Sequence, residues 1–435
     1  MCTWRQNNLP NSQTKRRFTM QKKLIAAAVA GLIAVPALAQ SNVTISGRFA
    51  AGWESYKLSG GGNTGHDAES RVSDQSSRII FNVVEDLGGG LKAWGQLDAR
   101  FAQDLGGSVG GTPAAGGKAA SATCAAVPCS NAAPLNGWAA GNTGMGLMSN
   151  WGKFTIGRWD VHYTETAKLE ATRAGSLQSI ISMALFSQIA YDPTAAAGGA
   201  VTTMGKGTRT DNLLMWDSPN WNGFTARIGY STGQAGNEGN TNRAVGNPGG
   251  GRMWTGALRY DNGPWTTGIS YWNNNSESRV TGAARLDARS TRAWVGYKFG
   301  MGLKVGFAWD GSKLDDSANG AVGAANAGSA RRHVWMIPVS YAFGPHAVYF
   351  NYAKAGGLSG SNVAPGFGGG TGANQWMAGY DYAFSKRTSA GVYYTKLNNG
   401  SRAAYDVLGL GANGGTPTTR GEDARQWYFG LAHNF

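Results

Sequence analysis

One pattern repeats from Val43 to Phe435: two segments of alternating apolar and polar residues joined by a short turn, then a longer connection rich in Gly, Asn and Ser. Alternation with a period of two is typical of a β-strand with one apolar and one polar face. Sixteen such segments are present, and short and long connections alternate strictly between them. This pattern indicates an antiparallel sheet in which all the short turns lie at the same end of the strands.

We expect strands at residues 43–57, 78–87, 91–103, 137–148, 152–158, 212–217, 224–231, 253–260, 265–272, 291–299, 303–310, 333–343, 347–354, 375–384, 389–396 and 425–435. The alternation is clearest in residues 333–343, where one face holds Trp335, Ile337, Val339, Tyr341 and Phe343. Pro338 lies inside this segment and has no N–H for a ladder, so we expect a β-bulge there.

Residues 20–39 have the three regions of a secretory signal peptide. Lys22 and Lys23 precede an apolar run that begins at Leu24 and ends Ala37-Leu38-Ala39. Met20 is the expected start, and we predict that residues 1–19 are an upstream extension; a genuine basic tail is the alternative. These 39 residues carry six of the cations behind the net charge of +14, which leaves +8 on residues 40–435 and suits anionic solutes or a lipopolysaccharide surface.

An apolar sheet face packs on a second sheet in a soluble sandwich and meets lipid in a membrane barrel. The signal peptide, the even number of strands and the alternation of short and long connections favour the barrel. Its closure also removes the edge strands that a bilayer does not tolerate. We therefore predict an all-β fold, a transmembrane antiparallel β-barrel of 16 strands, in a single domain at residues 40–435.

Residues 159–210 interrupt the alternation. They contain several acidic side chains and, at residues 176–188, a helix-like apolar spacing. A structureless insertion of this length inside a compact domain is usually functional. We expect this long third loop to fold into the barrel and narrow its lumen.

Cys124 and Cys129 are the two cysteines outside the N-terminal segment, and they lie in a stretch rich in Gly, Ala and Ser. In an oxidising compartment such a pair favours a small loop-closing disulfide over a metal site. No His lies near them. We expect neither a metal nor a cofactor.

Four segments resemble the Gram-negative general porin family, in particular the trimeric sixteen-stranded porins of β-proteobacteria. They are residues 77–93 (SRIIFNVVEDLGGGLKA), 211–219 (DNLLMWDSP), 382–388 (YAFSKRT) and 430–435 (GLAHNF). The resemblance implies a homotrimer in the Gram-negative outer membrane, surrounded by lipid and lipopolysaccharide, with the third loop as a constriction. It also implies that Phe435 is the signal for the barrel assembly machinery.

The sequence departs from the family in two places. The first strand, Val43-Thr-Ile-Ser-Gly-Arg48, lacks the family's common aromatic before the Gly, and the third loop lacks its commonest acidic Pro-containing motif. The resemblance therefore leaves the preferred solute open.

A porin acts through its pore radius and the electric field at its narrowest point. Arg78 and Arg100 are equidistant from Gly89 and lie on the parity opposite the apolar residues of their hairpin, so we predict that they are cross-strand neighbours in the lumen. Arg48 faces the lumen by the same criterion, with a structural ion pair to Asp98 or Glu54 as the alternative. Like charges side by side are unfavourable without compensation, which suggests a basic ladder opposite an acidic loop. Two solvated arginines away from the constriction are the other possibility.

Arg158 resembles the family's inward arginine at the loop entrance. It shares parity with the apolar residues Phe154 and Ile156, but we keep it as a candidate for the basic side of the constriction because Gly157 could break the strand. The acidic counterparts that we expect are Asp160, Glu165 and Glu170. Alternatively, each of these carboxylates is solvated or tied to an arginine of the barrel wall.

An enzyme needs a nucleophile with a base, or a set of metal ligands. The five histidines show no metal-binding spacing, and no phosphate-binding loop is present. An esterase built from unlinked Ser, His and acidic residues is the remaining enzymatic alternative. No nucleic-acid partner is expected.

These features predict a water-filled outer-membrane channel for passive diffusion of small hydrophilic solutes and ions, with a preference for anions. Two alternatives remain: a channel specialised for one anion class, carboxylate or phosphate, and a structural surface barrel with a closed lumen.

Overall fold

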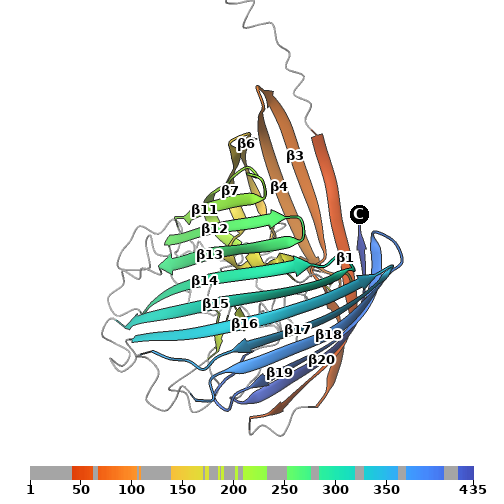
Figure 1. Cartoon of the computed structure of the whole chain (residues 1–435), viewed down its shortest axis with the longest axis vertical. Coiled ribbons are helices and arrows are strands. Elements are labelled where there is room, and N and C mark those ends of the chain that lie inside the picture. The colour runs from red at the N-terminus through yellow and green to blue at the C-terminus, as the bar shows by residue number, and fades with distance from the viewer. Residues whose placement is uncertain are drawn as a thin grey trace, which may run out of the picture.

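The computed structural model of the chain describes residues 42–61, 67–104, 107–108, 139–169, 172–175, 185–186, 188–190, 201–203, 209–232, 252–275, 284–318, 328–360, 369–405 and 420–435. Sixteen long strands form the barrel wall (Figure 1). They are β1 (Asn42–Gly60), β3 (Arg78–Gly88), β4 (Leu91–Ala102), β6 (Thr143–Ser149), β7 (Gly152–Asp160), β10 (Arg209–Asp217), β11 (Phe224–Ser231), β12 (Arg252–Asn262), β13 (Trp265–Asn275), β14 (Ala284–Lys298), β15 (Leu303–Ala318), β16 (Gly328–Phe343), β17 (His346–Ala355), β18 (Ala373–Ala383), β19 (Thr388–Asn399) and β20 (Glu422–Asn434).

The sheet closes because the last strand pairs with the first. β20 lies antiparallel to β1 over thirteen residue pairs, from Arg48 opposite Asn434 to Gly60 opposite Glu422. On its other side β1 pairs with β3 and, farther along, with β2 (Glu69–Asp74), so β2 and β3 form one interrupted strand. The predicted antiparallel 16-stranded barrel is confirmed.

Short strands accompany the wall. β5 (Gly107–Ser108) pairs with the end of β4, and β8 (Gln188–Ala190) with β9 (Val201–Thr203) forms a separate two-stranded sheet. A 3-10 helix, η2 (His162–Lys168), follows β7. No helix in the described part of the chain has the length and apolar character needed to cross a membrane.

The two faces of the wall differ as the alternation predicted. Ile45, Ile228 and Ile269 are 50–58% exposed on the outer face. On the opposite parity, Arg292 and Asp310 are almost fully buried. An apolar outer band with a polar interior is the arrangement that a bilayer requires of a barrel.

Several strands run farther than predicted at the end with long connections. β14 begins at Ala284 rather than residue 291, and β15 continues to Ala318 rather than 310. The ladder between them is continuous to Ala284 opposite Ala318. These ends of β14 and β15 carry Arg285, Asp287 and Lys313. The alternation of apolar and polar residues that predicted the strands is therefore absent here, although the backbone pairing continues.

The bulge expected at Pro338 is absent. The register from β15 to β16 is the same on both sides of this residue, and on the other edge Pro338 pairs regularly with Asn351. A Cβ added to Gly306 of β15 would lie 3.0 Å from Cγ of Pro338, so the small residue makes room for the ring.

The chain end is fixed at the seam by Gly47. The Gly47 and Phe435 main chains exchange two hydrogen bonds, with N–H to O distances of 3.0 and 3.1 Å between heavy atoms. The Phe435 ring stacks on Phe49 at 5.2 Å between centroids. A Cβ at Gly47 would lie 2.4 Å from Cζ of Phe435 and 2.5 Å from the carbonyl oxygen of Arg78.

We expect Gly47→Ala to destabilise the folded barrel by about 1–3 kcal/mol, the usual cost of overpacking a tight contact. Temperature-dependent loss of the folded, fast-migrating band in SDS gels measures the change. Gly95→Ala is the control, because a Cβ there meets nothing within 4 Å. Equal stability of the two variants would contradict a tight seam.

Candidate functional site

Three arginines form one row across the inner wall. Arg48 of β1 lies opposite Arg78 of β3, and Arg78 lies opposite Arg100 of β4. Neighbouring strands are about 4.8 Å apart, so the row spans roughly 10 Å. We call these three residues the arginine row.

The members of the arginine row have different partners. Arg100 donates to Ser76 Oγ at 2.8 Å and forms a 3.1 Å ion pair with Asp98. Arg48 donates to the main-chain oxygens of Arg173 and Ala174 at 2.8 and 3.2 Å, and to neither Asp98 nor Glu54 among the described atoms.

The Arg78 side chain makes no hydrogen bond or ion pair with the described residues. Its guanidinium lies within the electrostatic range of Arg48 and Arg100, which repel it, and of Asp98 and Asp160, which attract it. Its charge is therefore compensated from a distance rather than by contact.

Arg158 is set apart from this row, two strands beyond Arg100. Its Nη1 pairs with Asp211 Oδ1 at 2.6 Å. Gly157 has φ +141° and Asn212 has φ 53°, and the register between β7 and β10 shifts in this region. β7 is not broken at Gly157, since its pairing with β6 continues through Gly157 and Arg158; the extra residue lies on β10, where Asp211 neutralises Arg158.

Asp160 lies at the end of β7, where it accepts a 2.9 Å hydrogen bond from the Asn142 amide. Its closest cation is Arg209 of β10, 3.5 Å away. Arg209 in turn interacts with Arg100 and Asp98 through space. Asp160 and Arg209 therefore extend the charged cluster that begins with the arginine row.

Glu165 is held by arginines of the wall. Both carboxylate oxygens accept hydrogen bonds from Arg259 of β12, and Arg227 of β11 lies 3.4 Å away. Asp217 pairs with Arg227 at 2.7 Å, so two carboxylates and two guanidiniums balance one another. Burial alone would raise the pKa of Glu165, but the hydrogen bond from Arg259 and the two positive charges outweigh it and lower that pKa.

His162 fixes η2 to the next strands. Its Nδ1 lies 2.7 Å from Ser270 Oγ of β13, and its Nε2 lies 2.8 Å from Ser290 Oγ of β14. Ser290 donates to Asp310, which pairs with Arg292 at 3.0 Å. All five side chains are at most 4% exposed, so this Ser-His-Asp arrangement offers no access to a substrate and acts as a structural attachment.

A second attachment holds residues 172–175, farther along the same insertion. The Arg173 N–H donates to Asp381 of β18 at 2.6 Å, and the Gly175 N–H donates to the Tyr393 hydroxyl of β19 at 3.1 Å. Tyr393 itself donates to Asp381. Arg48 of β1 also binds this segment. The segment is therefore tied to inner-face residues on both sides of the pairing between β20 and β1.

Other residues of interest lie outside the described part of the chain. They are Glu170, Cys124, Cys129 and most of the helix-like stretch 176–188. Within that stretch the structure describes Leu185 and Phe186, and both are buried. Among the described residues no group of three or more His, Cys, Asp and Glu could hold a metal ion.

Sequence reasoning missed Arg209, Arg227 and Arg259. A signal for two of them existed, because Arg227 and Arg259 alternate with Ile228 and Leu258, which are exposed on the outer face. Their partner Glu165 comes from a segment without periodicity, so parity could place the arginines inward but could not identify what they bind.

We expect the attachment of η2 to weaken in acid. Burial lowers the pKa of His162 below its ordinary 6.5, although Asp310 and Glu165 oppose this shift and Arg292 adds to it. The detached segment then binds a proton more readily than the attached one, so the attachment is fully stable above pH 6.5 and weakens as the pH falls below that value.

Hydrogen exchange of the amides of residues 162–168, corrected for intrinsic rates, measures this effect. His162→Asn removes the titrating ring and should abolish the acid-dependent loss of protection. An unchanged pH dependence in that variant would contradict the assignment to His162.

Comparison with known proteins agrees with this architecture. The family model described as Gram-negative porin matches residues 26–402. An outer membrane porin protein of Bordetella pertussis is 25% identical over 422 residues, covering 87% of this chain and 95% of that protein.

Solved structures show the same fold. The anion-selective porin from Comamonas acidovorans superposes with a TM-score of 0.65 at 20% identity, covering 91% of this chain and all of that one. OmpT of Vibrio cholerae in its trimer form gives 0.55 at 12% identity, covering 91% and 99%. The match of the family model across most of the chain shows that this protein belongs to the Gram-negative porin family and resides in the outer membrane.

Proposed function

We propose that the protein forms a water-filled channel through which small hydrophilic solutes and ions diffuse passively, and that the channel prefers anions. The observation that carries this proposal is the arginine row, with Arg48, Arg78 and Arg100 at directly opposed positions of three adjacent strands. Rings or rows of cationic side chains at a narrow point select for anions. The Comamonas porin is itself described as anion-selective.

Few of the charges around the row are in contact with one another. Arg209 joins the three arginines, while Asp98 and Asp160 lie in range of Arg78, and Asp74 and Asp381 lie in range of Arg48. Among the described residues, only Asp98 of these four acids forms an ion pair with a member of the row. Glu165 contributes little to the field here, since Arg227 and Arg259 compensate it. In this proposal the main source of selectivity is the positive charge of Arg48 and Arg78, which no carboxylate among the described residues contacts, rather than a strong field between a basic wall and an acidic loop.

The constriction belongs to the same proposal. Residues 159–210 form the loop that narrows the lumen. Two described parts of this loop, η2 and residues 172–175, support the proposal. The hydrogen bonds given above join both parts to inner-face groups of the wall. In this proposal Asp160 lies at the entrance beside Arg158, and Glu170 is a further acidic group of the loop. Cys124 and Cys129 remain a proposed disulfide in another connection.

Processing and assembly follow the family. We infer a signal peptide at residues 20–39 after an upstream extension at 1–19, a homotrimer, insertion by the barrel assembly machinery through Phe435, and contact with lipopolysaccharide. OmpT of Vibrio cholerae, which shares the fold, is described in a trimer form. Conductance steps in threes from the purified protein in a planar bilayer would support the trimer, and absence of conductance would overturn the channel in favour of a structural barrel.

We expect Arg78→Glu and Arg100→Glu each to shift the reversal potential in a KCl gradient toward cation preference. Each variant changes the local charge by two within a row about 10 Å wide, comparable to the Debye length at 0.1 M salt. The shift should therefore shrink as salt is raised.

Lys92→Glu is the matched control for this test. Lys92 is an exposed residue of the same strand, eight residues from Arg100, or about 27 Å along an extended chain. Its substitution makes the same charge change far outside the screened range of the row. Selectivity that is unchanged in both row variants, or changed as much by Lys92→Glu, would remove the row from the proposal.

Deletion of residues 170–185 should raise single-channel conductance, because it removes the part of the insertion that Arg48, Asp381 and Tyr393 hold against the inner wall. Deletion of residues 406–419, between β19 and β20, is a control of similar length. Equal conductance of the first deletion and the intact chain would mean that the narrowing lies elsewhere.

A further inference from the structure

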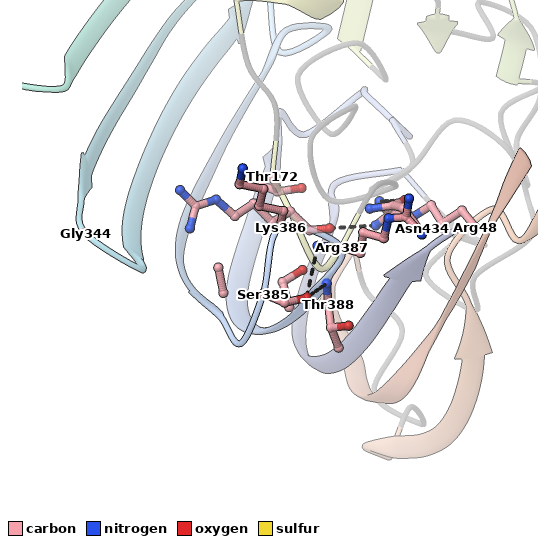
Figure 2. A pocket seen from close by; sticks show the side chains of 11 residues that line it. Arg48, Thr172, Gly344, Ser385, Lys386, Arg387, Thr388 and Asn434 are labelled. Carbon is pink, nitrogen blue, oxygen red and sulfur yellow. Dashed lines mark hydrogen bonds between the residues drawn. The ribbon is translucent and has the colours of Figure 1, made fainter.

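A cavity of about 550 Å³ lies where the attached segment 172–175 meets the short turns of the barrel (Figure 2). Its lining comes from five parts of the chain: Arg48 of β1, Arg173 of the insertion, Gly344 of the turn between β16 and β17, Ser385, Lys386 and Arg387 of the turn between β18 and β19, and Asn434 of β20. Sites for small organic ligands commonly enclose about 300–1,000 Å³. The space is thus larger than a single inorganic ion requires.

The lining is strongly positive. Arg48, Arg173, Lys386 and Arg387 all border the cavity, and no Asp or Glu is among the described residues that line it. Asp381, which accepts a hydrogen bond from the Arg173 main chain, is fully buried and also accepts one from the Tyr393 hydroxyl. Four cations therefore border one cavity without a lining carboxylate.

Part of this charge is built into the wall. Arg48 is 9% exposed, and its Nε has no hydrogen-bond partner among the described atoms, while its Nη2 is used by Arg173 and Ala174. A buried guanidinium N–H without an acceptor is costly, and a bound oxyanion would supply one. Lys386 and Arg387 are exposed at the rim, where their long side chains can reach an entering solute.

We propose that this cavity binds a small organic phosphate, with the phosphoryl group among Arg48, Arg173, Lys386 and Arg387 and the organic part in the remaining volume. A phosphate monoester concentrates nearly two negative charges and three acceptor oxygens on one group, which suits several cations that converge on one space. A dicarboxylate divides its charge between two separated groups and fits this arrangement less well.

The inference rests on the proposed function, since it names a solute class for the same channel. Arg48 belongs both to the arginine row and to the cavity, so an anion that passes the row arrives directly at the binding groups. The cavity adds retention at the short-turn end of the lumen, which makes the flux of organic phosphates saturable while the flux of chloride stays linear.

The test is isothermal titration calorimetry of the folded, detergent-purified full chain with glucose 6-phosphate at low salt. We expect saturable binding, weakened about tenfold or more in the double variant Lys386→Gln/Arg387→Gln, because each charged hydrogen bond lost has an effect of that order. Both side chains are exposed in a turn, so the variant should fold as the parent does. Lys92→Gln, a cation outside the cavity, should leave the affinity unchanged.

Each contrary result overturns the inference in a defined way. Absence of binding by the parent chain, or equal binding by the double variant, would remove the site. An equal loss in Lys92→Gln would indicate non-specific attraction only, and equal affinity for succinate would replace the phosphate class by carboxylates. Because calorimetry needs no conduction, a chain that binds but does not conduct contradicts the channel alone, and one that conducts but does not bind contradicts only the site.

Discussion

The pairing of β20 with β1 is the interaction on which the rest of this structure depends. A bilayer supplies no water to unpaired N–H and C=O groups, so a sheet is tolerated there only when its two edges meet. Thirteen residue pairs close the seam, and Gly47 allows the Phe435 ring to lie against it. Closure also fixes which parity faces lipid along every strand. The polar and charged side chains of the other parity must then find their partners inside.

The long insertion meets that requirement and is shaped by it. Buried charges of the wall are satisfied by η2 on one side, where Arg227 and Arg259 hold Glu165 and Arg292 donates to the His162 carbonyl. On the other side, Arg48 and Asp381 bind the main chain of residues 173 and 174, and Tyr393 binds that of residue 175. Removing one partner from a buried pair leaves an uncompensated charge, so these attachments are mutually dependent. The insertion is therefore a structural part of the wall's electrostatics as well as a proposed constriction.

Sequence reasoning succeeded where a strict period of two was present. The alternation placed all sixteen strands, and the symmetry of the hairpin around Gly89 gave the pairing of Arg78 with Arg100. It failed where the signal is not local. The ends of β14 and β15 lack an apolar parity, Pro338 is accommodated by Gly306 on another strand, and the partners of Arg48 are main-chain oxygens 125 residues away. Main-chain acceptors leave no trace in residue types, so no sequence pattern could have identified them.

In the proposed channel, Arg48 takes part in both selectivity and solute binding. Its position opposite Arg78 would be unfavourable if its charge were uncompensated, yet its hydrogen bonds go to neutral carbonyls, which spread the charge without cancelling it. A carboxylate partner would have been more stabilising locally, but it would have removed the positive potential at this point. Neutral acceptors hold the guanidinium in place, and under the proposed function they leave its charge available to solutes. Arg173 also has a neutral acceptor, because its Nη1 donates to the Pro345 carbonyl. In the proposed channel this arrangement extends the positive potential from the arginine row to the short-turn end of the lumen.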